Sequence, residues 1–207
     1  DTTTTTESQD TTTTTVAPST TTVAPSTDVN CGNLADSPFV DDEKIRVFAA
    51  SDLIEITISG VGGHAAKPQE TVDTTLVASH LILALQSIAS RNADPIEKVV
   101  VSVTSFETSS KAFNVIPERV HLRGTVRTMT PDMRDMVEKR ILEISRLTAE
   151  TYGAVADAEY IRSYPVMVNS PEQTQFAAEV ACKVAGKCDE ASLVMGGEDF
   201  SFMLCKI

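Results

Sequence analysis

The chain has 207 residues, of which 42% are hydrophobic, and its formal net charge is −12. This charge disfavours nucleic acids and anionic membrane surfaces as partners. We expect neither a secretory signal nor a membrane span, because no apolar run is long and continuous enough. The cysteines form no Cys-x-x-Cys pair, so we expect ordinary thiols rather than a zinc site or a disulfide framework. They are Cys31, Cys182, Cys188 and Cys205. None of these properties indicates a cellular compartment.

Residues 1–44 are predicted to form a disordered tail and linker. Most of the first 28 residues are Thr, Ser, Pro, Ala or Val, and the sequence of residues 16–20 recurs at 23–27. Such a segment has too little apolar bulk to offset the entropy lost on ordering. Its composition fits an O-glycosylated, mucin-like stalk, but a low-complexity spacer or an artefact of the gene model is the favoured interpretation.

The first predicted strand leads into a glycine-rich turn that carries a histidine. Residues 53–59 alternate in polarity, with Ile54, Ile56 and Ile58 on one face, which is typical of a half-buried strand. The turn at 60–68 then leaves His64 with little side-chain cover. A histidine there can titrate near neutrality or donate a hydrogen bond to a substrate oxygen, or it can simply bond a nearby carbonyl.

The same turn also matches the dinucleotide-binding pattern Gly-x-Gly-x-x-Ala, from Gly60 to Ala65. That motif needs an uninterrupted helix start and an acidic residue about 20 positions further on. Here Pro68 interrupts, and the region around Leu85 is apolar and helical in pattern. The nucleotide interpretation therefore fails on its context.

The next elements are a helix and two strands. The helix is predicted to start near Val72 and to end at residues 92–95. One apolar stripe runs along it, and consists of Val77, Leu81, Ala84, Leu85 and Ile88. Strands are predicted over residues 99–103 and about 118–128.

A second helix starts at Thr130 as N-cap with Pro131 in the first turn, and Gly153 closes it. Its buried side is marked by Met133, Val137, Ile141 and Ile144. A last strand at 155–161 completes a β-α-β-β-α-β order, which predicts an α+β, ferredoxin-like unit with an antiparallel sheet and two helices on one face. A helix at about 171–185 and a strand-like segment at 191–195 begin a different unit.

Several motifs in one order resemble the metal-dependent amidohydrolases of the aminoacylase, hippurate hydrolase and auxin-conjugate hydrolase family. The resemblance covers about residues 45–207. The motifs are Ala49-Ala50-Ser51-Asp52, Gly62-Gly63-His64-Ala65-Ala66, Ala112-Phe113-Asn114-Val115-Ile116-Pro117, Leu122-Arg123-Gly124-Thr125-Val126-Arg127-Thr128 and Met195-Gly196-Gly197-Glu198-Asp199-Phe200-Ser201.

The resemblance implies a lid and dimerisation domain at residues 52–165, inserted into an α/β metallopeptidase catalytic domain of which residues 166–207 are a truncated piece. The family's reaction is hydrolysis of the amide bond of an N-acyl amino acid or small peptide. It implies two divalent metal ions, zinc or manganese, and a glutamate base. The family's Cys-Gly-His-Asp and Glu-Glu ligand motifs are not found in this sequence. We therefore expect no metal site and no amidase activity in this chain.

By resemblance, His64 matches a lid histidine that enters the partner subunit's active site and stabilises the oxyanion. Asn114 and Arg127 match lid residues that hold the substrate carboxylate, and Gly196 and Gly197 match a loop beside the active site. The strand pattern also places Arg127 on the polar face, where a guanidinium suits a carboxylate or a plain salt bridge. Asn114 also suits a turn. A departure is Gln69, where these hydrolases usually have a second histidine.

The partners implied by the resemblance are a second copy, forming a homodimer, or a complete paralogue to which His64 is supplied in trans. The rival interpretations are a non-catalytic dimerisation or binding module, and a fragment of a complete enzyme. Lids of this type pair through an edge strand and its adjacent helix.

Overall fold

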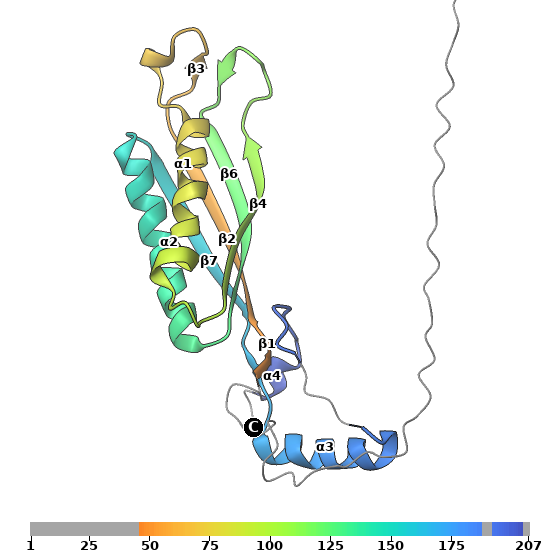
Figure 1. Ribbon diagram of the computed structural model, residues 1–207. Helices are drawn as coiled ribbons and strands as arrows, with labels where there is room; N and C mark the ends of the chain where they lie inside the picture. Colours follow the sequence, from red (N-terminus) through yellow and green to blue (C-terminus); the bar gives the residue numbers. More distant parts are fainter. Residues whose placement is uncertain (1–45, 188–191, 205–207) are drawn as a thin grey trace, which may run out of the picture. The chain divides into compact units, whose positions relative to one another are not determined.

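The structure, a computed structural model, describes residues 46–187 and 192–204. The predicted tail at residues 1–44 lies outside this range. A four-stranded antiparallel sheet in the order β4-β6-β2-β7 dominates the described part (Figure 1). Its strands are β2 (Ala50–Ser59), β4 (Val99–Thr108), β6 (Arg119–Thr128) and β7 (Val155–Tyr164). No helix in the described residues is long and apolar enough to cross a membrane.

Two helices pack on one face of this sheet. They are α1 (Thr74–Ser87) and α2 (Pro131–Thr151). The predicted order of strand, helix, strand, strand, helix and strand is the order observed along residues 50–164. In β2, Ile54, Ile56 and Ile58 are buried beneath the helices, whereas Leu53 and Glu55 are exposed, as period-two alternation requires.

The core of this unit is closed within its own elements. Its fully buried side chains come from β2, β6, both helices and the π-helical turn after α1, and each contributes roughly 1.5–3 kcal/mol by leaving water. They include Ile54, Ile56, Ile58, Leu81, Leu85, Ile88, Leu122 and Ile141. Because the whole cluster lies between Ile54 and Ala154, residues 51–164 have what a unit that folds by itself needs.

Smaller elements extend from the two ends of the sheet. At one end, β3 (Gly63–His64) pairs with β5 (Val115–Ile116). At the other, β1 (Arg46–Phe48) pairs with β8 (Met167–Val168). The remaining elements are a 3-10 turn at Pro68–Glu70, a π-helical turn at Ile88–Asn92, α3 (Pro171–Ala185) and α4 (Ser201–Leu204).

Local chemistry moves several predicted boundaries. Helix α1 begins at Thr74 rather than near Val72, because the Asp73 side chain accepts hydrogen bonds from the N–H groups of Thr75 and Leu76 and so caps the helix. Strands β4 and β7 are longer than predicted, because β4 continues to Thr108 and β7 to Tyr164.

Two other predictions are wrong. The segment around 191–195 is not a strand over its described residues, where Val194 makes a single parallel bridge to Phe48. Cys182 is not an ordinary thiol, because it is disulfide-bonded in the structure. The other three cysteines lie outside the described residues.

Candidate functional site

His64 and Asn114 lie together at one end of the sheet. The β3–β5 ribbon pairs His64 with Val115, and the Ala65 N–H donates to the Asn114 carbonyl oxygen at 2.9 Å. Gly62 makes this ribbon possible, since a Cβ there would lie 3.0 Å from both the Ile116 oxygen and the Glu118 nitrogen. The structure therefore brings two of the sequence-predicted site residues side by side.

The His64 imidazole is exposed and has a defined hydrogen-bond arrangement. The Ala66 N–H donates to His64 Nδ1 at 3.1 Å. In the neutral ring the hydrogen is then carried by Nε2, which makes Nε2 a donor. This arrangement leaves the Nε2 hydrogen available to an external acceptor.

Asn114 occupies a central position of a β-turn, because the Val115 N–H donates to the Ala112 oxygen at 3.3 Å. Its side chain is exposed and makes no hydrogen bond with any described residue. The turn role considered from the sequence is therefore real, and it leaves the side-chain amide available to a ligand.

Arg127 lies at the opposite end of the sheet, beside the glycine-rich loop. Its Nε donates to the Met195 oxygen at 3.1 Å, and its Nη1 donates to the Val126 oxygen at 3.0 Å and to Thr125 Oγ1. The loop is tightly seated, since a Cβ on Gly197 would lie 2.6 Å from the Ser51 Cβ. Because Met195 directly precedes Gly196 and Gly197, this hydrogen bond places Arg127 next to the two predicted glycines.

The two groups of site residues are far apart within one chain. Strand β6 starts beside the β3–β5 ribbon at Arg119 and reaches Arg127 eight residues later, which is roughly 26 Å of extended chain. A single small substrate cannot touch both groups of the same chain.

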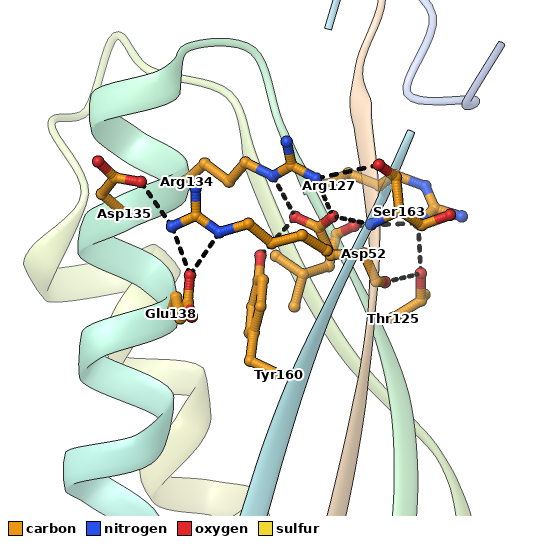
Figure 2. A network of polar contacts seen from close by, with 10 residues as sticks. Asp52, Thr125, Arg127, Arg134, Asp135, Glu138, Tyr160 and Ser163 are labelled. Atoms are coloured by element: carbon orange, nitrogen blue, oxygen red, sulfur yellow. Dashed lines mark hydrogen bonds and ion pairs between the residues drawn. The ribbon is translucent and has the colours of Figure 1, made fainter. Parts of the chain in front are cut away.

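A buried ion pair beneath Arg127 was missed by the sequence reasoning. Asp52 is 0% exposed and accepts hydrogen bonds from Arg134 Nε at 2.8 Å, Arg134 Nη2, Tyr160 Oη at 2.6 Å and the Ser163 N–H at 2.9 Å (Figure 2). Thr125 Oγ1 donates to the Asp52 carbonyl oxygen at 3.1 Å. The sequence contained one sign of this burial: Asp52 lies two positions before Ile54 and therefore on the same, buried face of β2.

This environment shifts the pKa of each partner. Burial raises the pKa of Asp52, but the hydrogen bonds from Arg134, Tyr160 and the Ser163 N–H outweigh burial and hold it below its usual value. The hydrogen bond to Asp52 raises the pKa of Arg134. Burial, with the Asp52 charge, raises the pKa of Tyr160. Asp52 and Arg134 are therefore both charged, Tyr160 keeps its proton, and the three side chains link β2, α2 and β7.

The described residues do not fit a dinuclear metal site. No three His, Cys, Asp or Glu side chains among residues 46–187 and 192–204 come together in an arrangement that could hold an ion.

An open pocket of about 490 Å³ lies beside the β3–β5 ribbon and is lined by Val61, Val115, Ser109, Ser110 and Glu118 among others.

Comparison with known proteins identifies the sheet unit. The peptidase dimerisation domain matches residues 52–152. N-acetyldiaminopimelate deacetylase from Enterococcus faecalis is 36% identical over 163 residues, which are 78% of this chain and 43% of that protein. IAA-amino acid hydrolase ILR1-like 5 from Arabidopsis thaliana is 37% identical over 162 residues, 75% of this chain and 37% of that protein.

The Bacillus subtilis YXEP protein, a dinuclear metal binding peptidase from the M20 family, superposes with a TM-score of 0.64 and 28% identity over 78% of this chain and 40% of that one. The chain belongs to the M20 peptidase family. It spans about two fifths of the length of these M20 relatives. The resemblance inferred from the ordered motifs is confirmed.

Proposed function

We propose that residues 52–165 are a ferredoxin-like lid and dimerisation domain that supplies substrate-binding residues to an amide hydrolase acting on N-acyl amino acids or small peptides. The observation that carries this proposal is the separation of His64 and Asn114 from Arg127 and the glycine loop. Residues that suit one substrate stand at opposite ends of one sheet, so a site that uses them all needs two lids.

The β4 edge is the better candidate for pairing. Edge strands that must stay unpaired usually carry charges. Strand β7 has three charged residues, Asp157, Glu159 and Arg162, whereas β4 has only Glu107, which is paired with Arg123. The neighbouring helix α1 contains no Asp, Glu, Lys or Arg, yet exposes Leu76 and Leu83 at 49% and 70%. An edge strand with a single, paired charge beside a helix without Asp, Glu, Lys or Arg suits contact with a second copy.

A two-fold axis at β4 would also bring the separated site residues of two lids close together. Edge strands related by such an axis run antiparallel, so the start of one β4 lies beside the end of its partner. Val99 pairs with Thr128 near Arg127, and Thr108 pairs with Val120 near the β3–β5 ribbon. The His64 end of one lid is thereby carried toward the Arg127 end of the other.

In such a pair, the Nε2–H of His64 donates to the scissile carbonyl and stabilises the oxyanion, because a positioned donor matches the charge that develops there. Asn114 and the remaining guanidinium donors of Arg127 hold the substrate carboxylate. Gly196 and Gly197 let the loop approach closely. Two zinc or manganese ions would supply the activated water in the parent enzyme.

We expect the chain as given to be inactive by itself, because the metal-ligand motifs of the family are not found in its sequence. The alternative functions are a non-catalytic dimerisation or binding module, and pairing with a complete paralogue. Dimerisation and pairing with a paralogue would both use the β4 edge.

The test uses the purified full chain in two measurements. Light scattering after size exclusion should give the mass of a dimer, and a monomer at all concentrations would refute the proposal. Hydrolysis of an N-acyl amino acid with added zinc or manganese should be undetectable. Turnover that a chelator abolishes would show a metal site in this chain and would overturn the expected inactivity.

A further inference from the structure

Phe113 is the most exposed large apolar side chain among the described residues, with a fractional exposure of 107%. Isolated apolar residues are common on protein surfaces, so exposure alone says little. The position is more informative, because Phe113 is the first central residue of the turn that carries Asn114. The neighbouring Ala65, whose N–H donates to the Asn114 oxygen, and Ala66 are both small and exposed.

The loop that carries Phe113 is well ordered by its own hydrogen bonds. The Ala112 N–H donates to Ser110 Oγ at 3.2 Å, and Thr108 Oγ1 donates to the Ser110 oxygen at 2.8 Å. The Ser109 N–H donates to the Arg119 oxygen at 2.9 Å. A preorganised loop loses little entropy when its tip contacts a ligand, which favours an apolar contact there.

We propose that Phe113 is a specificity-determining residue that contacts an apolar group flanking the scissile amide in the partner subunit's active site. This inference rests on the proposed function. Consecutive Cα atoms are about 3.8 Å apart, so a substrate held by Asn114 has the Phe113 ring within reach of one flanking group. That group is either the acyl chain or the amino-acid side chain, and an aliphatic or aromatic group buries the ring.

The test places residues 51–164 of this chain in the IAA-amino acid hydrolase from Arabidopsis thaliana, in place of the matching segment. The segment closes its own core, so the host supplies the rest of the enzyme. The kcat/KM values are measured for IAA-alanine, N-acetylalanine and IAA-leucine, with Phe113→Ala, Phe113→Leu and His64→Ala variants. Mass and thermal unfolding are compared to exclude misfolding.

Phe113→Ala is expected to lower kcat/KM about tenfold for substrates with the contacted apolar group and less than twofold for the others. A loss on IAA-alanine but not N-acetylalanine assigns the acyl group, and a loss confined to IAA-leucine assigns the side chain. Phe113→Leu should fall between wild type and alanine.

An equal effect of Phe113→Ala on all three substrates, or no effect, overturns the inference. His64→Ala separately tests the proposed function, since it should lower activity on every substrate whatever its apolar groups. If His64→Ala is active while Phe113→Ala discriminates, the lid-histidine role fails and the specificity role stands. A dimeric but inactive wild-type chimera overturns both.

Discussion

Asp52 and Arg134 form a buried, two-pronged ion pair that joins the first sheet strand to the second helix. The side chains are 1% and 13% exposed, so the carboxylate is shielded from water and the guanidinium largely so. The pair lies at the end of the sheet that also carries Arg127 (Figure 2), and Arg127 in turn bonds the Met195 oxygen beside the glycine loop. It ties the strands that surround that part of the site.

Asp52→Asn is expected to destabilise the fold by about 3–5 kcal/mol, because it leaves the Arg134 charge buried without its counter-ion. Urea unfolding followed by circular dichroism measures this loss. The matched control is Glu107→Gln, which breaks a pair with Arg123 whose side chains are 59% and 50% exposed. The control should leave the unfolding midpoint within error, and equal losses for both variants would contradict the buried role.

The same pair predicts how stability depends on pH. The folded-state pKa of Asp52 lies below its unfolded value, so the unfolded chain binds the proton first as the pH falls. The contribution of Asp52 is present above about pH 4 and is lost as the pH falls through the lower, folded-state pKa. The difference in unfolding free energy between wild type and Asp52→Asn should shrink across that acidic window. A difference that grew on acidification would have the wrong sign.

Gly124 should tolerate no side chain. A Cβ there would lie 2.4 Å from the Ser102 backbone oxygen, in the middle of β6 and beside the irregular step between Val103 and Ser105 of β4. Gly124→Ala is expected to cost about 1–3 kcal/mol through overpacking against backbone that cannot move. Gly153→Ala is a useful comparison, because it strains a positive φ of 76° but meets open space. Thermal unfolding distinguishes the two, and a larger loss at Gly153 would contradict this ranking.

Leu83→Glu on α1 should weaken the dimer. The leucine is 70% exposed, so a charge there costs the monomer little but must be desolvated in the proposed interface. We expect the dimer dissociation constant to rise roughly tenfold or more, which is 1.4 kcal/mol per factor of ten. Sedimentation of a dilution series measures it. Leu147→Glu on α2, where the leucine is 45% exposed, is the control that should leave dimerisation unchanged.

The sequence alone determined the main strands and helices of the sheet unit and their buried faces. Alternation in residues 53–59, the apolar stripe from Val77 to Ile88, and the Thr130 cap with Pro131 each reflect local rules, so they reappear in β2, α1 and α2. The polar face of β6 with Arg127 followed from the same period of two. These features depend on neighbours along the chain, which a sequence displays directly.

Only the tertiary structure decided which site residues meet. The pairing of His64 with Val115 spans 51 positions, and the bond from Arg127 to Met195 spans 68. The partners of Asp52 come from α2 and β7, 82 to 111 positions away. No local pattern encodes such pairs, because a carboxylate on a buried face is stable only once the chain has folded a guanidinium and a phenol against it.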